Sequence, residues 1–391
     1  MTHQPLPPFS CWAGPRHSRL LLVGEAWGRE EAESGLRQPF IGEAGKELWR
    51  MLGEAIQEHS TLHQRALEMH KFGLAWVRHR QPWLEATGIA MTNVLNFRPP
   101  NNSIEAIAAG KKELPSDYPS LPAISKGKYL LPEYLSELDR LQVEISDSQP
   151  NLILAFGNTA CWALLQSTSI GSLRGAITSG HGVYAQNKIL PSYHPAAILR
   201  QWSWRPIVVT DLMKAWREAD FPEIRRPARQ IIVNPTIDEI VDWTNTFLRW
   251  ANMPHSHALL SCDIETKAGQ ITCIGFARSS ENALVIPFLD ETRPGWCYWA
   301  DRRDELVAWR CVRDLLYCPA PKLFQNGVYD LQYLYRYGLR PRNVVHDTML
   351  LHHTLHPEMQ KGLGFLGSIY TNEPAWKLMR RKRPDTEKRD E

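Results

Sequence analysis

The sequence lacks a long apolar run and lacks any cysteine spacing typical of a metal site. No segment reaches the roughly 18 apolar residues that a membrane-spanning helix requires. The N-terminal residues MTHQPLPPFS contain no apolar core of a signal peptide. The seven cysteines include no CxxC pair, which excludes zinc-finger spacing and is typical of a reducing compartment. We therefore expect a cytoplasmic protein that makes no membrane contact.

Two nucleotide-binding signatures are absent as well. The chain contains neither GxGxxG nor GxxxxGKS/T, so the sequence does not indicate a Gly-rich cradle for a nucleotide phosphate. Its formal net charge of +3 is too small to indicate a nucleic-acid partner by itself. With 391 residues, of which 43% are hydrophobic, the chain is large enough for about two or three domains with cores of their own.

The first half of the chain alternates between apolar runs and segments with helical periodicity. Four apolar runs predict buried strands: residues 20–23, 88–95, 150–156 and 189–193. Helical spacing occurs between them, at residues 46–56, 61–84, 130–146 and 160–165. Strands that alternate with helices predict an α/β fold, here an α/β/α sandwich with a central parallel sheet.

Polar side chains follow three of these four strands. They are Glu25 with Glu30 and Glu31, then Asn93, then His194, and the loop after the first strand also contains Phe40. In a parallel sheet the carboxyl ends of the strands share one edge, so these groups are expected to converge on a crevice. An asparagine amide can read a base edge, a histidine can stabilise negative charge, and a carboxylate can position water. The combination suits extrusion of a base and cleavage of its glycosidic bond.

Several motifs carry this combination in order. They are GEAWG with PFIGEAG, then TNVLNFRPPNN, PNLILAFGNTA, SLRG and PSYHPAAILR. Over about residues 17–215 the chain resembles the uracil-DNA glycosylase superfamily, and within it most resembles family 4. The resemblance implies a DNA-binding hydrolase of base excision repair that acts on uracil.

The resemblance also implies roles for individual residues. Phe40 would stack on the flipped uracil, Asn93 would read its polar edge, and His194 would stabilise the uracilate leaving group at O2. Glu25 and Glu31 would hold the water or the oxocarbenium-like sugar, and the sequence does not tell which of them acts.

Four more residues would contact the substrate DNA. Asn102 ends the RPPNN motif, Ser172 and Arg174 would face the DNA backbone, and Leu199 would be a wedge into the gap left by the base. For Arg174 the alternative is a structural salt bridge.

The chain departs from the family pattern at two motifs. Trp27 stands where the family has proline in GEAPG, which predicts a narrower or reshaped pocket mouth. Family 4 carries an iron–sulfur cluster, and Phe97 stands where one of its cysteines is expected. The N-terminal CxxC is missing and leaves Cys11 alone, so we expect no cluster and no other cofactor for the glycosylase. Residues 61–84 are expected to be an insertion.

The second half of the chain begins after a charged, proline-rich stretch at residues 221–229 and places two acids on one strand. Asp263 and Glu265 are two residues apart, so their side chains lie on the same face of the strand. Such a pair is stabilised by Mg²⁺ or Mn²⁺, which prefer oxygen ligands. Asp330, one helical turn after Asn326, would add a third carboxylate.

These acids resemble those of the DEDD-type 3′–5′ exonuclease (proofreading) domain of phage-like family A DNA polymerases, over about residues 257–377. The resemblance implies an RNase H-like mixed α/β domain in which Asp263, Glu265 and Asp330 bind Mg²⁺ or Mn²⁺. The fourth acidic motif of that family is not found. Asp385 and Asp390 in the charged tail are poor substitutes, so the domain is expected to be truncated and its activity doubtful.

Two nearby features have simpler interpretations than a metal site. His352 and His356 are four residues apart without a third ligand at suitable spacing, and they are expected in the core or on the surface. Asp347, followed by Thr348, is expected to cap a helix.

The resulting prediction is a uracil-DNA glycosylase-like domain at residues 1–222, a linker with a helix at 223–256, and an exonuclease-like domain at 257–391. The expected location is the cytoplasm of a bacterial host, for a bacterial or phage-encoded protein, and a DNA polymerase is an expected partner. Two alternatives stay open. The chain could be a non-catalytic module that binds uracil-DNA or DNA ends and recruits a replicative polymerase, or a metal-dependent 3′–5′ exonuclease could be its main activity.

Overall fold

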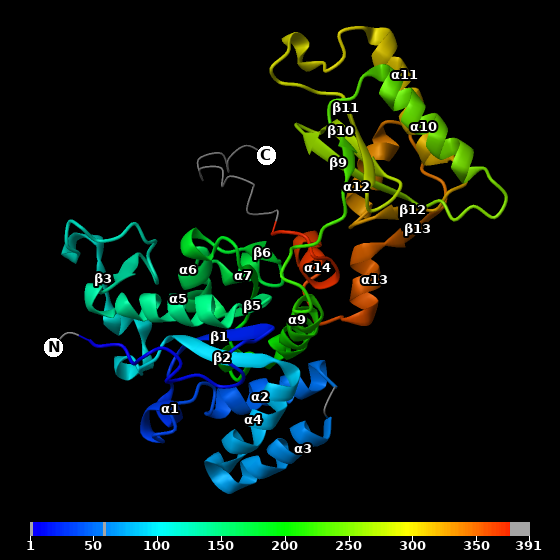
Figure 1. Ribbon diagram of the computed structural model, residues 1–391. Coiled ribbons are helices and arrows are strands. Elements are labelled where there is room, and N and C mark those ends of the chain that lie inside the picture. Colours follow the sequence, from blue (N-terminus) through cyan, green and yellow to red (C-terminus); the bar gives the residue numbers. More distant parts are fainter. Residues whose placement is uncertain (1–2, 58–59, 376–391) are drawn as a thin grey trace. The chain divides into compact units, whose positions relative to one another are not determined.

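The computed structural model describes residues 3–57 and 60–375 (Figure 1). The chain divides into two compact units, each with a sheet of its own. The first unit comprises Met1–Arg225 together with Gly367–Glu391, and the second comprises Arg226–Leu366. Asp385 and Asp390 lie outside the described residues.

The first unit is built on a five-stranded sheet with the order β2-β1-β5-β7-β6. The first four of these strands are parallel to one another, and β6 is antiparallel to β7. The strands are β1 (Leu20–Ala26), β2 (Ile89–Leu95), β5 (Leu152–Phe156), β6 (Thr178–Ser179) and β7 (Lys188–Ser192). A two-stranded sheet, β3 (Ala108–Gly110) with β4 (Lys128–Leu130), lies in the stretch between β2 and β5. The four predicted strands are thus present.

Helices cover both faces of this sheet. Leu20 and Leu22 of β1 belong to one buried cluster with α2, α4 and α9, whereas Leu21 and Val23 belong to another with α5 and α6. Alternate residues of a strand point to opposite faces, so this division confirms the three-layer α/β/α fold. The helices are α1 (Arg29–Glu33), α2 (Glu43–Ala55), α3 (Ser60–Met69), α4 (Trp76–Thr87), α5 (Ser136–Ser148), α6 (Gly157–Leu165), α7 (Ile170–Leu173), α8 (Pro195–Ile198) and α9 (Arg205–Glu218).

A cluster of tryptophans joins α3 and α4 to α2. The ring of His63 stacks on Trp49 with 4.6 Å between centroids and meets Trp83 edge-on. His63 is 8% exposed, and burial lowers its pKa to about 4. The imidazole is therefore neutral at pH 7 and behaves as part of the apolar core.

We expect His63 to make the first unit sensitive to acid. Its pKa is lower in the folded than in the unfolded chain, so its stabilising effect is complete above pH 6.5 and is lost as the pH falls toward 4. The loss in the free energy of unfolding is at most about 3 kcal/mol. Urea denaturation at pH 7.5, 6.0 and 5.0 measures it. His63→Phe should flatten this dependence, and an equal slope in the variant would contradict the assignment.

The second unit contains a six-stranded mixed sheet with the order β13-β12-β9-β10-β11-β8. β9, β10 and β11 form an antiparallel meander, and β12, β13 and β8 are each parallel to a neighbour. The strands are β8 (Gln230–Ile232), β9 (Leu260–Lys267), β10 (Gln270–Ala277), β11 (Asn282–Pro287), β12 (Lys322–Phe324) and β13 (Val344–Asp347). The helices are α10 (Ile237–Ala251), α11 (Arg302–Tyr317), α12 (Val328–Arg336), α13 (Thr348–Leu355) and α14 (Leu363–Tyr370), whose last residues belong to the first unit.

The boundaries of the units differ from those expected from the sequence. The segment 223–256, expected to be a linker with a helix, contributes β8 to the second sheet and packs α10 against α11. A second difference lies at the other end of the chain, where Gly367 onward belongs to the first unit. The ammonium of Lys214 on α9 donates to the carbonyls of Ser368 at 2.5 Å and Thr371 at 2.7 Å, and Asn372 donates to Glu218. These polar contacts attach the segment to the first unit.

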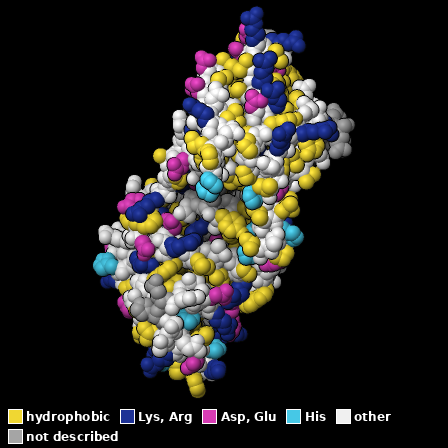
Figure 2. Space-filling view, turned by 90° about the vertical axis from the view of Figure 1, so that its right-hand side faces the viewer, with side chains coloured by type: hydrophobic (Ala, Val, Ile, Leu, Met, Phe, Trp, Pro, Cys, Tyr) yellow, Lys and Arg dark blue, Asp and Glu magenta, His cyan; other side chains and the backbone are white. Residues whose placement is uncertain are grey.

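No helix among the described residues is long and apolar enough to cross a lipid bilayer. On the face shown in Figure 2, basic, acidic and apolar side chains are interspersed.

Candidate functional site

A cavity of about 990 Å³ opens at the carboxyl ends of the parallel strands of the first unit. Six of the predicted site residues line it: Glu25, Glu31, Phe40, Asn93, Asn102 and His194. They come from the ends of β1, β2 and β7 and from the loops that follow. The structure thus brings together the residues that were expected to read and release a base.

The floor of the pocket is formed by Phe40 and Asn93, and both lie in close contact with Gly24 of β1. A Cβ atom built on Gly24 would lie 2.2 Å from Asn93 Oδ1 and 2.6 Å from Phe40 Cζ. Asn93 is 2% exposed and Phe40 5% exposed. Only glycine at position 24 allows the amide and the ring to approach the strand this closely.

His194 caps the short helix α8 and lies over Phe40. Its Nδ1 accepts a hydrogen bond from the backbone N–H of Ala196 at 3.2 Å, so the ring proton of the neutral form is on Nε2. Burial lowers the pKa of His194, and the charge of Glu25 opposes this only in part. The ring centroids of His194 and Phe40 are 6.1 Å apart. A neutral imidazole with an Nε2–H donor therefore lies beside the aromatic wall of the pocket.

The two glutamates of the first loop differ in their surroundings. Glu25 is half-buried and accepts a hydrogen bond from the hydroxyl of Thr159 at 2.5 Å. Glu31 is 7% exposed, and its carboxylate accepts from the backbone N–H groups of Ile41 at 2.9 Å and Gly28 at 3.1 Å. Both oxygens of Glu31 are thus engaged in holding the loop, whereas Glu25 lies beside His194.

The loop that carries Phe40 is held from behind by a buried arginine. Phe40 has a φ of +55°, a left-handed conformation that is unfavourable for a phenylalanine. Arg80 of α4 donates to the carbonyls of Phe40 at 2.8 Å and Pro39 at 2.7 Å. Burial lowers the pKa of Arg80 to about 10, and the charge of Glu31 opposes this. The helix that the sequence indicated as an insertion therefore supports the pocket, which no motif had indicated.

Of the four residues expected to contact DNA, three are exposed and one is buried. Asn102 and Ser172 are exposed, and Leu199 is 49% exposed. Arg174 is only 3% exposed and forms an ion pair with Asp211 at 2.7 Å. Its position corrects the expected contact with the DNA backbone and agrees with the alternative, a structural salt bridge. The motif SLRG could not show this because the partner lies 37 residues farther along the chain.

Further residues line the pocket beside the predicted site residues. Arg98 and Arg200 line it and add positive charge, and Tyr193 stacks on Trp204 with 4.3 Å between centroids. Arg98 belongs to the RPPNN motif, which could have indicated it. Trp27 also lines the pocket, at the position where the family has proline.

Phe97, which stands where family 4 has a cluster-binding cysteine, belongs to a group of aromatic side chains. The ring of Phe97 stacks on Tyr134 at 5.1 Å and contacts His3 at 4.5 Å between centroids. The side chains present here are aromatic and offer no thiolate, so they do not fit an iron–sulfur cluster.

In the second unit, Asp330 is buried while Asp263 and Glu265 are exposed on β9. Asp330 accepts a hydrogen bond from the N–H of Ile264 at 2.9 Å. Burial, followed by the charges of Asp263 and Asp347, raises its pKa to about 6. Among the described residues, no three His, Cys, Asp or Glu side chains converge closely enough to hold a metal ion.

The two features expected to have simpler interpretations do have them. Asp347 caps α13 by accepting from the N–H of Met349 at 2.8 Å, as the sequence predicted. His352 is buried, which fits the expectation of a core position.

The fold and the pocket define a class: a three-layer α/β/α protein whose site lies at the carboxyl edge of a parallel sheet. Within that class the chain belongs to the uracil DNA glycosylase superfamily, whose sequence profile matches residues 11–219.

No curated protein sequence matches the chain. Among solved structures, the chain is similar to Escherichia coli RNase D, an exoribonuclease involved in structured RNA processing, with 16% identity, a TM-score of 0.27 and coverage of 38% of this chain. It spans 34% of the RNase D chain. It is also similar to the EXD2 exonuclease domain soaked in Mg and dGMP, with 15% identity, a TM-score of 0.23 and coverage of 39% of this chain and 76% of that one.

Proposed function

We propose that the first unit hydrolyses the N-glycosidic bond of uracil in DNA after the base is flipped out of the strand. The observation that supports this most is that Phe40, Asn93, His194 and Glu25 line one cavity. The cavity is large enough for a nucleoside, and its polar groups face an aromatic wall. The product would be an abasic site in DNA repair.

Base recognition would depend on Phe40 and Asn93. Uracil stacked on Phe40 presents alternating acceptor and donor groups at its edge, and an asparagine amide can pair with both. Because Asn93 is 2% exposed, the surrounding atoms restrict its amide before the base arrives. A restricted amide rejects a base of the wrong hydrogen-bond pattern, since its own polar atoms would stay unpaired.

Bond cleavage would depend on His194 and Glu25. When the C1′–N1 bond breaks, the electron pair stays on uracil and its negative charge spreads to O2, where the Nε2–H of His194 would donate. The sugar becomes cationic, and Glu25 would stabilise it and orient the water that adds to C1′. The proton released by the water balances the charge of the departing uracilate.

Substitution of Glu25 should mainly affect the reaction rate, whereas substitution of Glu31 should mainly affect stability. Glu25→Gln is expected to lower kcat on the order of tenfold, since one charge facing a cation contributes about that much. Glu31→Gln is expected to lower the free energy of unfolding by about 1–3 kcal/mol, because an amide cannot accept from all the N–H groups that Glu31 binds. Single-turnover rates and urea denaturation measure the two effects. The reverse pattern would make Glu31 the acting carboxylate.

The DNA strand would be held around the mouth of the pocket. We propose that Asn102 and Ser172 contact the backbone and that Leu199 enters the gap left by the base. Arg98 and Arg200 would add phosphate contacts, which predicts binding that weakens as salt is raised.

The deciding experiment measures free uracil released from labelled single- and double-stranded oligonucleotides in EDTA. The proposal expects release by the wild type and a strongly reduced but measurable rate in Asn93→Ala. If the wild type binds uracil-DNA and releases nothing, the chain is a non-catalytic reader that recruits another protein, such as a DNA polymerase. The place we propose for the protein is the cytoplasm of a bacterial or phage-infected cell.

Two finer assignments accompany this proposal. We assign the first unit closest to family 4 on its motifs, without the iron–sulfur cluster that Phe97 does not fit. We assign the second unit to the RNase H-like proofreading exonucleases of family A DNA polymerases, with Asp263, Glu265 and Asp330 as the residues that would hold Mg²⁺ or Mn²⁺. Because the three carboxylates do not converge among the described residues, we derive no reaction step through a metal.

The alternative, in which a metal-dependent 3′–5′ exonuclease is the main activity, predicts a different result. It requires shortening of a 3′ end that depends on Mg²⁺ or Mn²⁺ and disappears in Asp263→Ala. EDTA would abolish this activity and leave uracil release unchanged, so the two activities can be measured in one preparation.

A further inference from the structure

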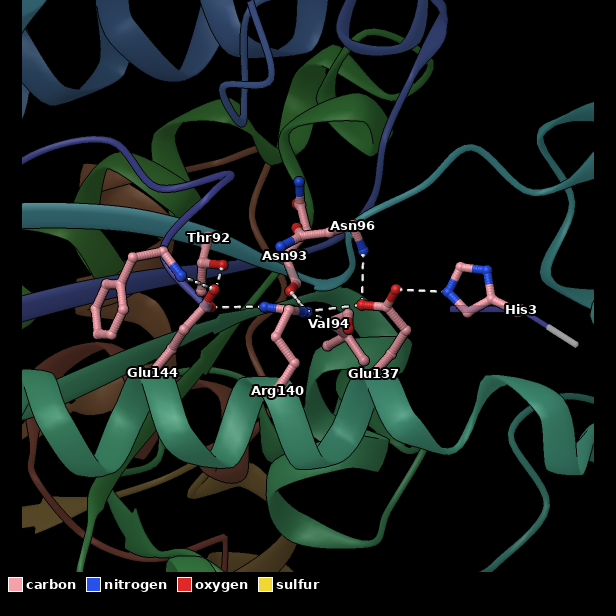
Figure 3. Close-up of polar contacts among 9 residues, drawn as sticks. His3, Thr92, Asn93, Val94, Asn96, Glu137, Arg140 and Glu144 are labelled. Carbon is pink, nitrogen blue, oxygen red and sulfur yellow. Dashed lines mark hydrogen bonds and ion pairs between the residues drawn. The ribbon is translucent and has the colours of Figure 1, made fainter. Parts of the chain in front are cut away.

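Strand β2 lies at the edge of the first sheet, where Ala13 pairs with Met91, and three buried charged residues of α5 contact the strand nearer its carboxyl end. Glu137, Arg140 and Glu144 share one face of the helix because they are three and four residues apart. Figure 3 shows their side chains extending from the helix to the strand. Arg140 forms ion pairs with Glu137 at 2.9 Å and Glu144 at 2.6 Å. We call these three residues the α5 triad.

The guanidinium of Arg140 contacts the backbone of the residue expected to read the base. Its Nη2 donates to the carbonyl of Asn93 at 2.8 Å and to that of Val94 at 2.7 Å. An edge strand leaves such carbonyls without a neighbouring strand, and a buried carbonyl needs a donor. The planar guanidinium binds these two carbonyls through Nη2 while its Nε and Nη1 bind Glu137 and Glu144, and a lysine ammonium has too few donors for all four acceptors.

The two carboxylates of the triad bind the strand on either side of this point. Glu137 accepts from the backbone N–H of Asn96 at 3.1 Å, and Glu144 accepts from the hydroxyl of Thr92 at 2.8 Å. Asn93 is therefore fixed between two contacts on the same helix.

The segment before β1, residues 3–16, which we call the N-terminal arm, supplies further donors to the triad. His3 Nε2 lies 2.7 Å from Glu137, and the backbone N–H of Phe9 donates to Glu144 at 2.9 Å. The arm thus covers the ends of a network that is closed to solvent, since both glutamates are 0% exposed.

We propose that Arg140 is a positioning residue for Asn93, and that the α5 triad fixes the amide in the orientation that discriminates uracil from other bases. This role rests on the proposed glycosylase function. It places three buried charged side chains behind the residue that would read the base.

The test is a double-mutant cycle of Arg140→Lys with Asn93→Ala, measured as kcat/KM for uracil release. Arg140→Lys keeps the charge and removes the planar guanidinium, so a roughly tenfold loss is expected in the wild-type background, the size usual for a lost supporting contact. Because Arg140 acts through Asn93, Arg140→Lys should cost nothing more in the Asn93→Ala background. Equal losses in both backgrounds would show a merely structural role and overturn the proposal.

Lys188→Arg is the matched control. Lys188 is also a buried cation of the first unit, and it binds the carbonyls of Glu218 at 2.7 Å and Phe221 at 2.6 Å from the amino end of β7. Lys188 makes none of the contacts of the α5 triad with β2. Lys188→Arg should therefore change kcat/KM by the same factor in the wild-type and Asn93→Ala backgrounds.

Amide hydrogen exchange of residues 89–97 tests the positioning role without relying on enzymatic activity. Arg140→Lys should speed exchange in this segment by about tenfold while Lys188→Arg leaves it unchanged. If Arg140→Lys does not fold, the neutral variant Glu137→Gln/Arg140→Met/Glu144→Gln takes its place, since it leaves no buried charge unpaired. A wild type that releases no uracil would end the glycosylase proposal. Unchanged exchange in either triad variant would overturn the positioning role whether or not the wild type is active.

Discussion

Replacing His194 with alanine is expected to lower kcat for uracil release by about 10²- to 10³-fold. The imidazole is the donor placed to meet negative charge on the leaving base, and its Nδ1 is already engaged by the N–H of Ala196. Alanine removes the Nε2–H donor, and a water molecule in its place must reorient during the reaction. KM should change little, because the charge that His194 meets develops only as the bond breaks. Single-turnover release of uracil measures the loss.

His181→Ala is the control for this prediction. His181 is exposed in the same unit, and its side chain does not line the pocket. Its substitution should leave kcat unchanged. Release by His194→Ala within threefold of the wild-type rate would mean that the donor to the leaving base lies elsewhere.

Replacing Gly24 with alanine is expected to abolish most uracil release, by about 10²-fold or more. The added methyl would meet Asn93 Oδ1 and the Phe40 ring at distances that real atoms do not adopt, so one of the two groups must move. Either movement displaces a group that would contact the base. KM should rise and kcat should fall, because stacking on Phe40 and recognition of the base edge by Asn93 depend on the same close contact with Gly24. Uracil release and the affinity for uracil-containing oligonucleotide measure the effect.

Gly171→Ala is the matched control, since Gly171 lines the pocket and its added methyl would meet no atom within 4 Å. It should leave release near the wild-type rate. A Gly24→Ala variant that is fully active would show that the floor of the pocket is not where the base binds.

The gathering of Glu25, Asn93 and His194 could be predicted from the sequence. Each follows an apolar run, and parallel strands place their carboxyl ends at one edge, so topology alone brings the three together. Phe40 needed the family motifs, because a phenylalanine in a loop is otherwise more simply explained as core.

The different roles of Glu25 and Glu31 could not be predicted, because they have the same chemistry and lie in the same loop. What separates them is the direction of backbone N–H groups at Ile41 and Gly28, which exist as a set only after the loop has folded. Arg174 shows the same limit, because its burial depends on Asp211, a partner on α9.

The supporting arginines were missed for a related reason. Arg80 and Arg140 act on backbone carbonyls, and a carbonyl is present at every position of a sequence. A pattern of side chains therefore gives no signal for such contacts. Only the fold shows that α4 and α5 each place one cation behind a residue of the pocket.

The return of the chain to the first unit after residue 366 determines how the two units can be separated. A stop codon after Arg225 would remove the carbonyls of Ser368 and Thr371 and leave the buried Lys214 ammonium with one of its three acceptors, the carbonyl of Gly175. Burial already lowers the pKa of Lys214 to about 8, so this residue would then be prone to deprotonate in the shortened chain. Excising residues 226–366 and joining the cut ends with a flexible peptide preserves those acceptors. The second unit is inserted in the sequence of the first unit. We therefore expect an internal deletion to preserve the first unit better than a C-terminal truncation does.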